Sequence, residues 1–127
     1  MTHIPVTLLY GSLTALLVAA LGANVSRLRG TKKVFIGDTP DSELQRTIRA
    51  HGNATEWAPL MIVMLLILEL IGTSSLILHV CGGAILTARL SHAVGVLTKN
   101  PLSTVGASLT YLVALGMPIY ALVLRFR

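Results

Sequence analysis

Charged and amide side chains adjoin a long apolar run in residues 46–59, RTIRAHGNATEWAP. On a helix with about 100° per residue, four of these polar side chains fall within roughly 80° of one another: Arg46, Arg49, Asn53 and Glu56. No charged residue occurs from Trp57 to Leu68, so this polar face lies where an apolar helix reaches the membrane boundary. Ionisable groups at that depth are costly and mark a functional site by default.

The composition is that of an integral membrane protein. Of 127 residues, 54% are hydrophobic and 12% are charged, whereas soluble domains carry about one quarter charged residues. The length allows one domain, residues 1–127. The net charge of +5 does not indicate nucleic-acid binding, because basic residues beside apolar spans act as orientation signals and no basic surface with interleaved aromatic residues is present.

Four apolar segments are long enough to cross a hydrocarbon layer of about 30 Å. We predict helices over residues 4–29, 40–71, 75–98 and 101–125. No Lys or Arg precedes the first segment and four follow it closely, so we expect an uncleaved helix and not a signal peptide. Short connections make neighbouring helices antiparallel. The sequence therefore predicts an all-α integral membrane protein, an antiparallel four-helix transmembrane bundle.

The basic residues predict the orientation of the bundle. Eight of them flank the first and third connections, against Arg125 and Arg127 at the other side. The excess marks the cytoplasmic side, so we expect both termini outside. The polar face would then share its membrane level with further side chains from the other three helices: Arg27, Arg89, His92, Ser103 and Thr104.

Three other residues have plainer interpretations. Cys81 is the single cysteine and lies in an apolar stretch, so we predict a small core residue, no intrachain disulfide and no metal site. His51 points away from the polar face and is expected at the membrane interface or between subunits. Glu69 lies near the far end of the second helix and is expected to extend its carboxylate to the opposite interface.

The segment RAHGNATEWAP resembles the second-helix signature of the membrane-associated proteins in eicosanoid and glutathione metabolism, the MAPEG family. That signature is approximately R-x-x-x-N-x-x-E-x-x-P, and four residues match it: Arg49, Asn53, Glu56 and Pro59. The chain length, the four spans and Arg27 at the end of the first helix also agree. A further A-R-x-x-H run occurs in the third helix, at Ala88, Arg89 and His92.

This resemblance implies a homotrimer of four-helix subunits that binds glutathione between neighbouring subunits near the cytoplasmic face. It also implies a glutathione transferase, a glutathione peroxidase or an eicosanoid synthase, with glutathione as co-substrate. We expect a bacterial member of the family in the inner membrane. Its second substrate would be a lipophilic small molecule that enters from the membrane lipids.

Glutathione carries two carboxylates, one ammonium and a thiol, so its receptor needs several cations, an anion and amide groups. An arginine grips a carboxylate well because its guanidinium is planar, two-pronged and always charged. Glu56 could accept the ammonium or could neutralise the arginines between the spans. The glutathione-binding residues that we predict are Arg27, Arg49, Asn53, Glu56, Arg89 and His92.

The sequence departs from the family pattern where catalysis is concerned. Ser103 stands at the start of the fourth helix, where family members with well-supported catalysis commonly place an arginine near the thiol. Thr104 could hydrogen-bond the sulfur or could simply cap the helix. His92 could touch the ligand or could be a buried histidine that bonds a neighbouring helix. Ser103 and Thr104 are therefore only weak candidates for catalytic residues.

Two classes of function remain open. The protein could transfer glutathione thiolate to a lipophilic electrophile, or use it to reduce a hydroperoxide, because cations near a sulfur raise the thiolate fraction. It could instead be a noncatalytic trimer, either one that binds glutathione or lipid, or a structural one. In the structural case the arginines and Glu56 form a buried ion network that fixes helix register.

Overall fold

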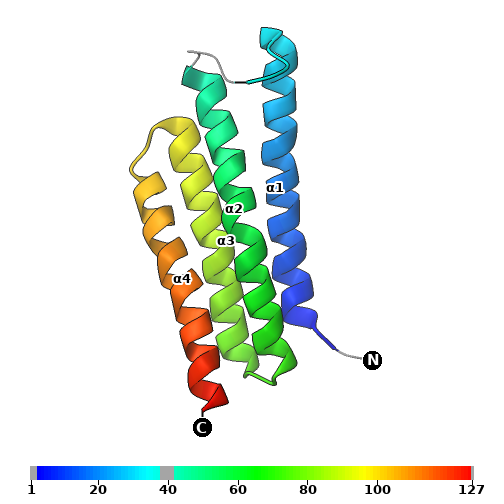
Figure 1. Cartoon of the computed structure of the whole chain (residues 1–127), viewed down its shortest axis with the longest axis vertical. Coiled ribbons are helices and arrows are strands. Elements are labelled where there is room, and N and C mark those ends of the chain that lie inside the picture. Colours follow the sequence, from blue (N-terminus) through cyan, green and yellow to red (C-terminus); the bar gives the residue numbers. More distant parts are fainter. Residues whose placement is uncertain (1–2, 38–41, 127) are drawn as a thin grey trace.

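The computed structural model describes residues 3–37 and 42–126. In these ranges the chain forms four antiparallel helices (Figure 1): α1 (Pro5–Lys32), α2 (Ser42–Leu70), α3 (Ser75–Thr98) and α4 (Leu102–Arg125). All four are long and apolar enough to cross a membrane. The all-α prediction is confirmed, and the helix ends agree closely with the expected ranges, although the predicted start of the second helix at residue 40 lies outside the described residues.

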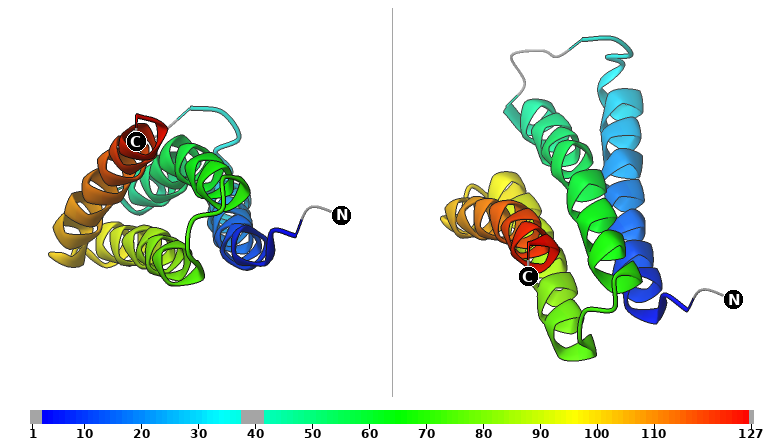
Figure 2. Two further views of the ribbon diagram at one scale, coloured as in Figure 1. Left: turned by 90° about the horizontal axis from the view of Figure 1, so that it is seen from below. Right: turned by 60° about the horizontal axis from the view of Figure 1, so that its bottom comes forward.

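The helices do not close into a symmetric bundle. Helix α1 packs on α2 and α3, and α4 packs on α3 and α2, whereas α1 and α4 do not touch each other. Figure 2 shows α1 and α4 on opposite sides of α2 and α3. The outward faces of α1, α2 and α4 are therefore open to lipid or to another subunit.

The apolar core lies around α2. Met61, Leu65 and Leu68 are fully buried and recur at the spacing of one helix face. They pack with Ile85 of α3 and Met117 of α4. Many large apolar side chains point outward instead, including a 69% exposed Leu112, as expected where lipid replaces water.

Helices α3 and α4 approach each other at two glycines. A Cβ atom on Gly95 would overlap the backbone of Ser103, and a Cβ atom on Gly106 would overlap the backbone of His92. Small residues permit such close helix contact in membranes, where van der Waals packing drives association. The glycines thus fix the start of α4 against the end of α3.

Glu69 has a partner that the sequence did not indicate. Its two carboxylate oxygens accept hydrogen bonds from the backbone N–H groups of Val6 (2.9 Å) and Thr7 (2.7 Å). The first N–H groups of a helix have no intrahelical partner, and Ile4 provides no side-chain cap for α1. Glu69 therefore caps α1 from the end of α2.

His51 contacts α1, a partner that the sequence did not indicate. Its half-buried ring lies over Gly22 of α1, where an added Cβ would be 3.1 Å from the His51 Nε2. The absence of a side chain at Gly22 makes room for the imidazole between the two helices. His51 thus packs inside the subunit.

Candidate functional site

Arg89 is the most deeply buried of the predicted site residues, with 1% of its surface exposed. From α3 its Nη1 donates to the Oδ1 of Asn53 at 2.7 Å and to the Asn53 carbonyl at 3.3 Å, both on α2. The structure therefore joins two of the residues predicted to bind glutathione. A guanidinium that meets two oxygens of one residue also fixes the offset of α2 along α3.

Two of the three guanidinium nitrogens of Arg89 have no partner in the described part of the chain. Its Nε and Nη2 are shielded from solvent and find no hydrogen-bond acceptor among the described residues. Buried donors are nearly always satisfied in proteins, so these two groups are open to an acceptor from outside the described residues.

Arg49 and Glu56 lie on the outward side of α2. Their side chains are 67% and 57% exposed, and the Arg49 Nη1 is 4.0 Å from the Glu56 Oε1. The same side continues toward the other end of the helix with Leu60 and Val63, each 52% exposed. We call these four residues the α2 outward face. It begins with the opposite charges of Arg49 and Glu56 and continues with the apolar Leu60 and Val63.

Arg27 does not join this group. Its Nε and Nη2 both donate to the Oδ1 of Asn24 on the same helix, at 3.2 and 2.9 Å, and its side chain is exposed. Arg46, one turn before Arg49 on α2, is half-buried. The Nε of Arg46 has no hydrogen-bond acceptor in the described part of the chain.

His92 connects α3 to the start of α4. Its Nδ1 is 3.0 Å from the Ser103 carbonyl oxygen, and because a carbonyl only accepts, Nδ1 carries the proton and donates. The Ser103 hydroxyl donates to the Asn100 carbonyl at 3.1 Å. Thr104 has an exposed side chain. His92 and Ser103 thus both make bonds that hold the helix connection, and of these side chains only Thr104 is open.

Two features beside the polar residues were not part of the predicted site. Trp57 of α2 and Tyr111 of α4 form an edge-to-face pair, with ring centroids 5.1 Å apart. The two residues are 54 positions apart in the sequence, and the packing of α4 on α2 brings their rings together. Trp57 directly follows Glu56, so this aromatic pair adjoins the charged part of the α2 outward face.

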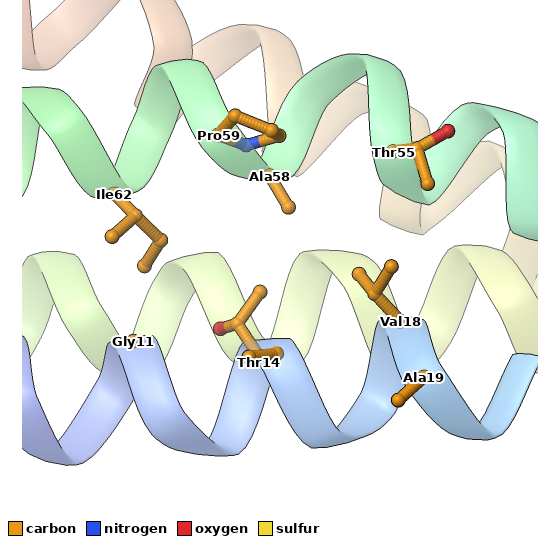
Figure 3. Close-up of a pocket in the computed structure, with 9 residues that line it drawn as sticks. Gly11, Thr14, Val18, Ala19, Thr55, Ala58, Pro59 and Ile62 are labelled. Atoms are coloured by element: carbon orange, nitrogen blue, oxygen red, sulfur yellow. The ribbon is translucent and has the colours of Figure 1, made fainter.

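A cleft of about 420 Å³ also separates α1 from α2 on the membrane side of Glu56. Figure 3 shows Thr14 and Val18 of α1 facing Ala58 and Ile62 of α2 across it. Its walls are almost wholly apolar, with Gly11 and Ala15 as small residues on the α1 side. An apolar cleft next to a charged group is the arrangement expected where a lipophilic molecule meets a polar one.

Comparison with known proteins places this arrangement in a family. Residues 7–123 match the MAPEG family. The chain is 43% identical over 90 residues to the inner membrane protein YecN of Escherichia coli K12, which covers 71% of this chain and 69% of the relative. The same identity and coverage hold for YecN of Escherichia coli strain CFT073. With four membrane-spanning helices and a family match over nearly its whole length, the chain is a multi-pass membrane protein that belongs to the MAPEG family.

Proposed function

We propose that this protein binds glutathione at the charged part of the α2 outward face, between subunits of a homotrimer. The observation that carries the proposal is the buried Arg89 guanidinium, which Asn53 holds through Nη1 while Nε and Nη2 have no acceptor among the described residues. Arg49 and Glu56 lie on the same helix as Asn53. The cation of Arg49, the amide of Asn53 and the anion of Glu56 are therefore at about the same level of the membrane. Such a set complements the carboxylates, peptide groups and ammonium of glutathione.

The loose contact between Arg49 and Glu56 favours a ligand over a purely structural ion pair. At 4.0 Å their closest N and O atoms are at the limit of an ion pair, and both side chains are more than half exposed. Exposed pairs of this kind add about 0–1 kcal/mol to stability. Both groups therefore remain available, Arg49 for a carboxylate and Glu56 for an ammonium group.

The exposure of these charges also supports the homotrimer. Glu56 lies about 21 Å along α2 from Leu70, which places it within the apolar layer. A charge facing lipid there costs at least about 2.5 kcal/mol. A neighbouring subunit packed on the α2 outward face would cover Glu56 and Arg49 and would enclose the ligand.

The orientation and the membrane follow from charge and from the relatives. Most basic residues flank the two connections that lie at one end of the bundle, which favours the cytoplasm for that end and both termini outside. The similar proteins of Escherichia coli are named inner membrane proteins. We therefore propose an inner-membrane protein with its glutathione site at the cytoplasmic side.

The proposed reaction transfers the glutathione thiolate to a lipophilic electrophile, or reduces a lipid hydroperoxide with it. A thiolate needs nearby cations or hydrogen-bond donors. The Ser103 hydroxyl is already bonded to Asn100, so the arginines and the open Thr104 hydroxyl would supply this stabilisation. The apolar cleft between α1 and α2 is suited to the second substrate. The alternative is a trimer that binds glutathione without turnover, and the missing cation at Ser103 favours it.

The test is calorimetry of glutathione binding to the detergent-purified protein, followed by turnover assays. We expect binding to the native chain and a loss of at least about tenfold in Arg49→Ala, equal to about 1.4 kcal/mol. Lys99→Gln is the matched control, since it removes an exposed cation outside the site. No binding by the native chain, or equal binding by Arg49→Ala, would refute the site. Turnover of 1-chloro-2,4-dinitrobenzene or of a lipid hydroperoxide separates an enzyme from a binder.

A further inference from the structure

A second cavity lies at the opposite end of the bundle from the glutathione site. It has a volume of about 770 Å³ and is bounded by the α2–α3 turn on one side and the end of α4 on the other. Figures 1 and 2 show this turn and the C-terminus at the same end of the molecule. None of the residues that line it belongs to the predicted site, so any ligand here is a different one.

The cavity has a cationic and hydroxyl-bearing edge. Arg125, the last residue of α4, lines it together with Thr73 and Ser74 of the turn. The Thr73 hydroxyl is shielded from solvent, so the exposed Ser74 is the hydroxyl residue open to a ligand at this edge. Ser74 makes no side-chain cap on α3. A guanidinium and a hydroxyl can both donate to phosphate oxygens.

Arg125 has no acidic partner in the described part of the chain. Among the described acidic residues, Glu69 is the one closest in the sequence to the α2–α3 turn. Both of its carboxylate oxygens accept hydrogen bonds from backbone N–H groups at the start of α1. Among the described Lys and Arg residues, Arg125 is the one that lies at this end of the bundle. Its exposed guanidinium is therefore open to an anion such as a lipid phosphate.

Most of the other lining residues are apolar. They include Ile67 of α2, Ile71 of the α2–α3 turn, Ile77 of α3 and Leu124 of α4. Ile71 is 54% exposed, so the wall continues onto the surface that faces the membrane. A molecule that fits must therefore carry a phosphate at the membrane boundary and a hydrocarbon chain directed into the bilayer.

We infer that this cavity binds one phospholipid from the adjoining leaflet, with its phosphate on Arg125 and the Ser74 hydroxyl and an acyl chain along Ile67 and Ile71. The bound lipid would connect the α2–α3 turn to the end of α4. This inference does not depend on the proposed glutathione site.

Native mass spectrometry of the detergent-released protein tests it, with phosphatidylglycerol as the probe. We expect retained lipid on each native subunit, and at least about fivefold less bound lipid in Arg125→Gln, because a charge-assisted contact to phosphate is lost. Lys99→Gln removes a cation at the other end of the bundle and should bind lipid as the native chain does. Ala121→Phe fills the cavity without changing charge and should lower binding as well.

Two further ligands identify what is recognised. Diacylglycerol has the chains without the phosphate, and inorganic phosphate has the anion without the chains, so both should bind much more weakly than phosphatidylglycerol. Equal retention of diacylglycerol would overturn the inference, since it would show an apolar groove only. Equal affinity for inorganic phosphate would overturn the lipid assignment. Native-like lipid binding in both Arg125→Gln and Ala121→Phe would place the lipid elsewhere.

Discussion

The guanidinium of Arg89 donates to the side-chain oxygen of Asn53 at 2.7 Å, from α3 to α2. With its oxygen directed at Arg89, the Asn53 amide presents its NH₂ group to other partners. This group could donate to a carbonyl or carboxylate of the proposed ligand. The contact thus anchors Arg89 and orients the Asn53 amide at the proposed glutathione site.

Replacement of Asn53 by Ala should destabilise the protein by about 3 kcal/mol, because it leaves the buried guanidinium without its side-chain acceptor. The measurement is thermal unfolding of the detergent-purified protein, followed by circular dichroism. Asn24→Ala is the matched control: it removes an amide that also binds an arginine, but Arg27 is exposed, so a loss of at most about 0.5 kcal/mol is expected. Equal losses in the two variants would mean that the Arg89 contact adds no stability.

Exchange of the charges in the double variant Arg49→Glu with Glu56→Arg separates ligand binding from a structural ion pair. A structural pair would tolerate the exchange, because the attraction between the two charges is kept. A glutathione site would not, because each charge then faces the wrong group of the ligand. We expect nearly native thermal stability with glutathione affinity lowered by at least about tenfold, or about 1.4 kcal/mol. Native affinity in the exchanged variant would argue against ligand contact.

Gly106→Ala should disturb the contact between α3 and α4, since its Cβ would overlap the His92 backbone. Overpacking of this kind costs about 1–3 kcal/mol, and more where only backbone can move. Gly116→Ala, on the same helix, meets no atom within 4 Å and should be neutral or slightly stabilising. Thermal unfolding of both variants provides the comparison. A Gly106→Ala protein as stable as the native one would show that the helices can separate without cost.

Glu69→Gln should weaken the start of α1, because a neutral amide offers one acceptor oxygen where the carboxylate offers two. Charge-assisted bonds to helix N–H groups contribute about 1–2 kcal/mol. Hydrogen exchange at Val6 and Thr7 reports on the two bonds directly, and faster exchange there is expected. Glu56→Gln removes a carboxylate with no bond to α1 and should leave this exchange unchanged. Unaltered protection in Glu69→Gln would show that the cap is dispensable.

Ser103→Arg should raise glutathione turnover if the missing cation limits the reaction. Ser103 lies at the start of α4 beside His92, where a longer cationic side chain could approach the thiol and increase the thiolate fraction. We expect at least about tenfold faster conjugation, a gain of about 1.4 kcal/mol in transition-state stabilisation. Ser103→Gln is the uncharged control of similar length. An increase in both variants, or in neither, would show that charge at this position does not limit catalysis.

Sequence alone determined the features that depend on one helix at a time. The length of each apolar run specifies a membrane span, and turn residues divide the runs, so the four helices could be predicted. The periodicity of about 3.6 residues placed Arg49, Asn53 and Glu56 on one face of α2. The motif that contains them was enough to identify the MAPEG family, which the family match confirms.

Only the tertiary structure decided which helix faces meet. Glu69 caps α1 from 62 and 63 residues away, His51 lies over Gly22, and Arg89 reaches Asn53 across 36 residues. Each contact depends on the rotation and the axial offset of one helix against another. Periodicity within a single helix carries no information on either quantity, because both are set by how side chains from different helices pack together.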